Sequence, residues 1–74
     1  MTSRDQDAVI ERAACIFGAV EVDPLAGSDV VSIRGWDDGR AVTPHVLLTA
    51  DCDPDAEVEA LEHMARCLPW RAAA

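Results

Sequence analysis

The segment DVVSIRGWDDGRAVTPHVLLTA, residues 29–50, carries the strongest structural signal in this chain of 74 residues. Two runs rich in β-branched and apolar residues flank Asp38-Gly39, a dipeptide typical of a two-residue type I′ turn. The pattern therefore predicts an antiparallel hairpin in which residues 29–36 pair with residues 41–50.

This turn sets a register that can be checked against the side chains. One face is then almost wholly apolar and contains the pairs Gly35–Val42, Ile33–Pro44 and Val31–Val46, together with Leu48. The other face is mixed and pairs Trp36 with Ala41, Arg34 with Thr43, Ser32 with His45, and Val30 with Leu47. Such a division is what a half-buried sheet requires. Because Pro44 has no N–H to donate, its strand is predicted to lie at a sheet edge or to contain a bulge.

A helix is predicted on each side of the hairpin. The first covers about residues 4–17, with Ser3 as N-cap, Gln6 completing a weak capping box and Gly18 as C-terminal cap. A short edge strand is predicted over residues 19–23. The inward stripe of the first helix comprises Val9, Ala13, Ile16, Phe17 and Val20, widened by Ile10 and Ala14.

The second helix has the clearer boundaries. Asp53 is predicted as its N-cap and Pro54 as its first residue, and Pro69 ends it. Its inward stripe comprises Val58, Leu61, Met64, Ala65 and Leu68, and its outer side contains a predicted Glu62–Arg66 ion pair. Trp70 is expected to pack back onto the core.

Together these elements predict a single small α+β domain over residues 1–74. Its architecture is a two-layer sandwich, an antiparallel sheet of two or three strands with two helices on one face, in the order α-β-(β)-β-α. That order resembles the topology of double-stranded-RNA-binding domains. The basic residues that such binding requires are missing, so no function follows from the resemblance.

Charge is the main functional clue. Fourteen aspartates and glutamates oppose six arginines, which gives a formal net charge of −8. An acidic surface repels nucleic acid and anionic membranes and favours a basic protein partner. The absence of lysine agrees with the codon usage of a GC-rich genome. A salt-adapted acidic proteome would explain the charge as a solubility device without a partner.

The three cysteines, Cys15, Cys52 and Cys67, show no paired spacing. The first residues do not resemble a signal peptide, and the apolar runs are too short to span a bilayer. We therefore expect a cytoplasmic protein with reduced thiols. Cys15 and Cys67 are predicted to lie in the core.

Six acidic residues lie between positions 51 and 62. Their spacing superficially matches a calcium loop, but Ala56 stands where a glycine is needed and Pro54 interrupts the loop. Asp55, Glu59 and Glu62 are predicted to share one side of the helix. Four helical residues rise about 6 Å, which is the scale on which successive nucleic-acid phosphates are spaced. The alternative is an ordinary solvated helix face.

Metal binding and catalysis have weaker support. His63 and Cys67 are spaced i,i+4, and His45 with Cys52 could complete a four-ligand zinc set, but the short paired spacing of structural zinc sites is missing. Asp51 and Asp53 flank Cys52 and oppose thiolate formation. A domain of this size also offers little concavity for desolvating carboxylate pairs. We therefore expect no metal, no cofactor and no enzymatic activity.

Trp36 is a candidate anchor for a partner. It lies on the mixed sheet face beside Asp37 and Asp38, and an aromatic side chain surrounded by charge is typical of a protein-binding hot spot. The structural alternative is that Arg34 lies over its ring.

The sequence thus suggests a non-enzymatic acidic module that inhibits a partner stoichiometrically. Its carboxylates would face the basic nucleic-acid-binding surface of that partner, for example a nuclease complex, as anti-CRISPR and anti-restriction proteins of phages and mobile elements do. This analogy rests on size and charge. The predicted partner-binding residues are Trp36, Asp37, Asp38, Asp51, Asp53, Asp55, Glu59 and Glu62. The alternative is a homodimeric structural or regulatory subunit that buries Val30, Leu47 and Trp36 across a two-fold axis.

Overall fold

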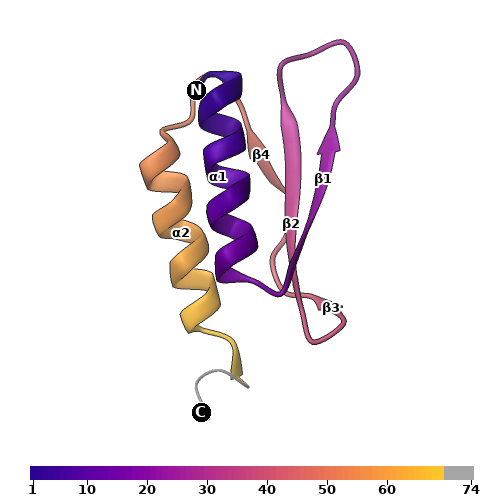
Figure 1. The fold of residues 1–74 in the computed structure, drawn as a ribbon, viewed down its shortest axis with the longest axis vertical. Coiled ribbons are helices and arrows are strands. Elements are labelled where there is room, and N and C mark those ends of the chain that lie inside the picture. Colours follow the sequence, from indigo (N-terminus) through magenta and orange to yellow (C-terminus); the bar gives the residue numbers. More distant parts are fainter. Residues whose placement is uncertain (70–74) are drawn as a thin grey trace.

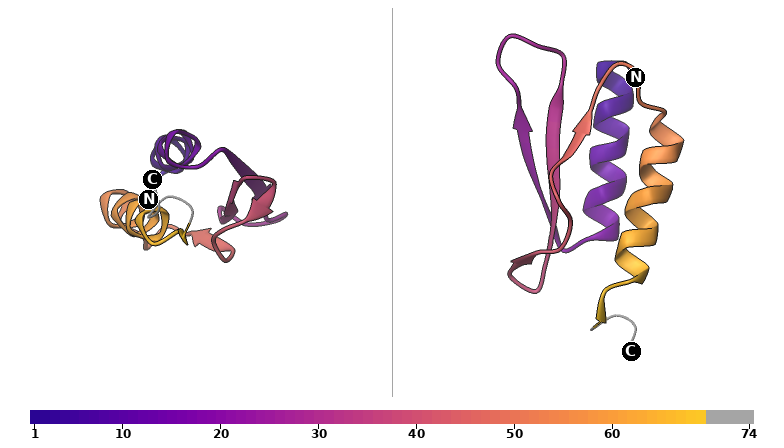
Figure 2. Two further views of the ribbon diagram at one scale, coloured as in Figure 1. Left: turned by 90° about the horizontal axis from the view of Figure 1, so that it is seen from below. Right: turned by 180° about the vertical axis from the view of Figure 1, so that it is seen from behind.

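The computed structural model describes residues 1–69 and shows two helices beside a four-stranded antiparallel sheet (Figure 1). Both helices lie on the same side of the sheet (Figure 2), which confirms the predicted two-layer α+β fold. In chain order the elements are α1 (Ser3–Ile16), β1 (Ala19–Pro24), β2 (Val31–Asp37), β3 (Arg40–Ala41), β4 (Val46–Leu48) and α2 (Pro54–Arg66). Within residues 1–69, no helix combines the length and apolarity needed to cross a lipid bilayer.

Strand β2 lies at the centre of the sheet. It pairs with β1 on one side and with both β3 and β4 on the other. The pairing with β1 runs from Ala19 opposite Trp36 to Pro24 opposite Val31, so the predicted short strand is confirmed and is one residue longer. The sheet has four strands instead of two or three because the second strand of the hairpin is interrupted.

The hairpin turn has the predicted conformation. Asp38 has a φ of 53° and Gly39 a φ of 74°, and a type I′ turn requires positive φ at both central residues. The pairing of Trp36 with Ala41 is also as predicted. The register therefore starts correctly at the turn.

Beyond the turn, the predicted register is wrong by two residues. Ile33 pairs with Val46 instead of Pro44, and Val31 pairs with Leu48 instead of Val46. Side chains alternate between faces with a period of two, so this shift keeps Val46 and Leu48 on the predicted apolar face.

Thr43 and Pro44 are the physical reason for the interruption. The Gly35 N–H donates to the Thr43 side-chain Oγ1 at 2.8 Å, and the Thr43 hydroxyl donates to the Pro44 carbonyl at 2.9 Å. A side-chain oxygen thus replaces a backbone acceptor where the chain bulges. The prediction that Pro44 marks a bulge or edge is confirmed.

The core lies between the sheet and the two helices. Its buried members are Val9, Ala13, Phe17, Ile33, Leu48, Leu61, Ala65 and Leu68. The predicted stripe on α2 is confirmed, with Val58 and Met64 partly buried against the core. Three expectations about burial were wrong, because Ala14, Cys15 and Cys67 are exposed. Trp70 lies outside the described residues.

Helix α1 begins one residue earlier than predicted. Its N-cap is Thr2 instead of Ser3, and the capping box is completed by Asp5 instead of Gln6. The Asp5 N–H donates to Thr2 Oγ1 at 3.1 Å, and the Thr2 N–H donates to Asp5 Oδ2 at 2.9 Å. Asp5 stands three residues after Thr2, which is the spacing that a reciprocal box requires.

The other helix ends differ in how well they were predicted. Helix α1 ends with Phe17 as C-cap in an extended conformation, so Gly18 does not form a left-handed cap. At the start of α2, Asp53 is the N-cap and Pro54 occupies the first turn, both as predicted, and the Asp53 side chain accepts from the Asp55 N–H.

Candidate partner-binding surface

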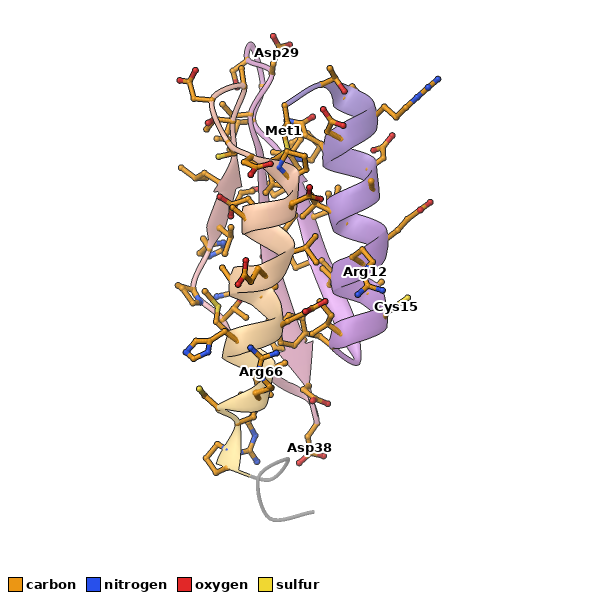
Figure 3. All side chains as sticks on the ribbon, turned by 90° about the vertical axis from the view of Figure 1, so that its left-hand side faces the viewer. Met1, Arg12, Cys15, Asp29, Asp38 and Arg66 are labelled. Atoms are coloured by element: carbon orange, nitrogen blue, oxygen red, sulfur yellow. The ribbon has the colours of Figure 1, made fainter. Side chains whose placement is uncertain are left out.

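The eight predicted partner-binding residues do not form one patch. Trp36, Asp37 and Asp38 lie at the β2–β3 turn, whereas Asp51 and Asp53 lie at the start of α2, at the opposite end of the molecule (Figure 1). Figure 3 shows Asp38 at one end and Met1 towards the other. The structure therefore defines two separate candidate surfaces.

The first surface is the α2 acid row, which we define as Asp55, Glu59 and Glu62. Their i, i+4 and i+7 spacing places all three on one side of α2. Asp55 and Glu59 are exposed and Glu62 is half-buried. The exposed Asp51 precedes the helix in the chain and adds a further carboxylate near its start.

Glu62 connects this row to α1. Its Oε1 lies 2.8 Å from Arg12 Nη2, so the pair predicted with Arg66 is replaced by a pair between the two helices. Both side chains are substantially exposed, at 59% for Arg12 and 37% for Glu62. An exposed pair of this kind contributes at most about 1 kcal/mol. Within residues 1–69, Asp55 and Glu59 form no such pair, and their charges face solvent.

Some of the acidic residues at the start of α2 stabilise the helix. Asp53 Oδ1 accepts from the Asp55 N–H at 3.3 Å, and Asp55 and Glu57 lie in the first turn. The positive end of the helix dipole favours these carboxylates. Asp53 therefore has a structural role, which leaves the α2 acid row as the portion available to a partner.

The second surface surrounds Trp36. The Arg34 guanidinium lies 5.1 Å from the centre of the Trp36 ring, and its Nη2 lies 3.2 Å from Glu21 Oε1. One face of the indole is therefore covered by a cation–π contact, as the structural alternative predicted. Trp36 remains half-buried.

A shallow cavity of about 370 Å³ adjoins Trp36. We call it the Trp36 recess, and it is lined by Gly18, Ala19, Trp36, Asp37, Asp38 and Gly39. Its lining thus comprises three small residues, one tryptophan and two aspartates.

The four-ligand set weighed and rejected in the sequence analysis is not assembled among the described residues. Among the described residues, no three His, Cys, Asp or Glu side chains gather as a metal site requires. His45 Nδ1 lies 3.4 Å from Ser32 Oγ on the sheet, and Cys52 Sγ accepts from the Thr49 N–H at 3.5 Å. These two side chains are therefore engaged locally and do not converge with His63 and Cys67.

The sequence pattern did not indicate the important contacts that two polar residues make. Gln6 is buried, and its Nε2 donates to the carbonyls of Asp29 at 2.6 Å and Leu48 at 2.9 Å, which ties α1 to the sheet. Its position three residues before Val9, on the inward stripe, was a usable signal. Arg12 carried no comparable signal, because its partner lies on the other helix.

Comparisons with protein-family models, curated proteins and solved structures found no match. The chemistry of both surfaces follows from their own side chains. The α2 acid row carries three carboxylates, and the lining of the Trp36 recess includes one tryptophan and two aspartates. Both surfaces are acidic.

Proposed function

We propose that this protein is a non-enzymatic acidic binding module that occupies a basic surface of another protein. The most specific form of the proposal is a stoichiometric inhibitor of a nucleic-acid-binding protein or nuclease complex, of the kind found among anti-CRISPR and anti-restriction proteins. One observation carries it: six of the fourteen acidic residues lie in residues 51–62, and that segment contains no basic residue.

The spacing of the α2 acid row supports mimicry of a nucleic-acid backbone. With a rise of about 1.5 Å per residue, Asp55 and Glu59 are about 6 Å apart along the helix axis. Lysines and arginines arranged to bind successive phosphates could therefore bind these carboxylates instead. Attraction between the row and a basic surface would also accelerate association and make it sensitive to salt.

A homodimer remains the second candidate because one large apolar side chain on the outer sheet face is exposed. Leu47 is 50% exposed, and it lies opposite Ser32 in the sheet. A two-fold contact over Leu47 and Trp36 would also cover the Arg34–Glu21 pair, which would have to be desolvated. This cost makes the acidic binding module the better supported function.

The test has two stages. The immobilised protein first captures partners at low salt, and each purified partner is then loaded with a fluorescent DNA or RNA duplex. We expect the wild-type protein to displace the duplex at about one equivalent. The variant D55N/E59Q/E62Q should fail to do so, because it removes the charges that imitate phosphates.

A charge-matched control separates position from net charge. The variant D7N/E11Q/D23N removes three exposed carboxylates outside α2 and should displace the duplex as the wild type does. The single variant R12Q checks that loss of the Arg12–Glu62 pair is not the cause. Equal loss of activity in both triple variants would show that only net charge matters. Failure of the wild type to displace duplex from any captured partner would refute the proposed function.

A further inference from the structure

The last turn of α2 and its C-cap residue, Cys67, present two metal-binding side chains next to each other. His63 Nε2 lies 3.8 Å from Cys67 Sγ, and both residues are exposed. The Cys67 N–H donates to the His63 carbonyl at 3.2 Å, so backbone structure fixes their relative position. Neither side chain contributes to the core, and the proposed function does not use them.

The separation of the two atoms matches the geometry of zinc. Tetrahedral zinc with Zn–S near 2.3 Å and Zn–N near 2.05 Å places the sulfur and nitrogen about 3.6 Å apart. The observed 3.8 Å differs from this by a few tenths of an ångström. A single ion could therefore bridge the pair with only a small rotation of either side chain.

We propose that His63 and Cys67 form half of a zinc site, which the same two residues of a second copy complete. Structural zinc takes four ligands, and the described residues of one chain supply no third ligand to this pair. Two copies related by a two-fold axis supply a His₂Cys₂ set. The four-ligand set weighed in the sequence analysis lay within one chain and is not assembled among the described residues, because His45 and Cys52 are engaged elsewhere.

Charge makes this dimer dependent on the metal. Each chain carries a formal charge of −8, so two copies repel each other when no cation lies between them. The carboxyl-terminal end of α2 has a partial negative charge that favours a cation beside Cys67. Because the two Cys67 thiolates balance the two positive charges of zinc, the metal–ligand bonds, and not a change in net charge, hold the two copies together against this repulsion.

Proton balance predicts the pH dependence. Each Cys67 loses its S–H proton to solvent as the Zn–S bond forms, and each His63 binds through the lone pair of a neutral ring. Two copies therefore release two thiol protons for each zinc ion. Lower pH should weaken binding, because protons compete for both kinds of ligand.

The experiment titrates Zn²⁺ or Co²⁺ into the full-length protein, kept reduced with a phosphine that excludes disulfides. Light scattering measures the mass, and cobalt absorption reports tetrahedral thiolate ligation. We expect one metal ion per two chains, a doubled mass, a thiolate-to-cobalt band, and return to monomer with EDTA. The variants H63A and C67A should lose all of these signals.

Matched controls use the other exposed or half-exposed thiols. C15S and C52S should bind metal as the wild type does, and so should D55N/E59Q, which separates this site from the proposed function. One metal ion per chain without a change in mass would overturn the two-copy site. Wild-type behaviour of C67A, or a dimer that persists in EDTA, would overturn it as well.

Discussion

Side chains are buried where the end of α1 contacts β2, whereas they are exposed to solvent on the outer side of α2. At the first, Phe17 is 4% exposed and its ring lies against Gly35, where an added Cβ would come within 2.8 Å of the ring. At the second, Asp55 and Glu59 face solvent without an ion pair to any described residue. The first region is satisfied internally, whereas the second is available to something outside the chain.

We therefore expect the first region to determine the stability of the fold and the second to determine partner binding. Substitutions at the α1–β2 contact should lower the free energy of unfolding, and substitutions in the α2 acid row should leave it nearly unchanged. The following predictions test that division.

The largest effect is expected at Phe17. Replacing Phe17 with alanine should lower the free energy of unfolding by about 3–5 kcal/mol, because it removes buried aromatic surface and leaves a cavity. Urea denaturation followed by circular dichroism measures the change. A loss below about 1 kcal/mol would show that the Phe17 ring is not buried as described.

Gly35→Ala should lower the free energy of unfolding by a smaller amount, about 1–3 kcal/mol, because the added methyl group overpacks the same contact. Denaturation of G35A alone and of G35A combined with Phe17→Leu tests the cause. The smaller leucine side chain should relieve part of the penalty, so the two substitutions should couple favourably. Simple additivity of the two losses would contradict a direct contact between these residues.

The capping box of α1 should have a moderate, pH-dependent effect. Hydrogen bonds from the Thr2 backbone and side chain lower the pKa of Asp5 below its ordinary value of 3.8. The carboxylate therefore stabilises the fold above that pH, and the contribution disappears as the pH falls through the lower folded pKa. Thr2→Ala should lower the free energy of unfolding by about 1 kcal/mol near neutral pH, because the N-cap side chain is lost.

Unfolding measured as a function of pH tests this assignment. The difference between wild type and D5N should shrink as the pH drops through the lowered pKa of Asp5, because the Thr2 backbone N–H that lowers this pKa most is retained in T2A. Ser3→Ala is the control and should have little effect, since Thr2 and not Ser3 is the N-cap. A larger loss for S3A than for T2A would contradict the observed helix start.

The smallest effect on stability is expected in the α2 acid row. The variant D55N/E59Q should lower the free energy of unfolding by about 0.5 kcal/mol, because Asp55 loses its interaction with the helix dipole and Glu59 is an exposed position without special contacts. Denaturation at low and at high salt measures it. A loss above about 1.5 kcal/mol would mean that these carboxylates hold the fold together.

Local signals explain what the sequence could predict. The start of α2 was predictable because Asp53, Pro54 and Asp55 all favour the same helix boundary. The Asp38-Gly39 turn was predictable because few other dipeptides favour positive φ at both positions. Both signals are contained within a few neighbouring residues.

The incorrect predictions arose where two residues compete for the same role or where the contact joins residues distant in the sequence. Thr2 and Ser3 are both good N-caps, and the position of Asp5 decided between them. The strand after the turn lost its register because the Thr43 hydroxyl competes with the backbone for the Gly35 N–H. Cys15 and Cys67 were assigned to the core by residue type, although both are exposed.

The candidate site was predictable only in part. The shared face of Asp55 and Glu59 followed from helical spacing alone. The pairing of Glu62 with Arg12 depended on how the two helices pack, which no local pattern contains. The sequence could not tell whether Arg34 lies over the Trp36 ring. The structure shows that it does.

The salt dependence of partner affinity tests the central claim most directly, since that claim is that the exposed carboxylates of α2 bind a cationic surface. Affinity is measured from low to high salt for wild type, D55N/E59Q/E62Q and D7N/E11Q/D23N. We predict a steep loss of wild-type affinity with added salt, the same slope for D7N/E11Q/D23N, and a much shallower slope for D55N/E59Q/E62Q. Identical slopes for all three proteins would contradict the claim.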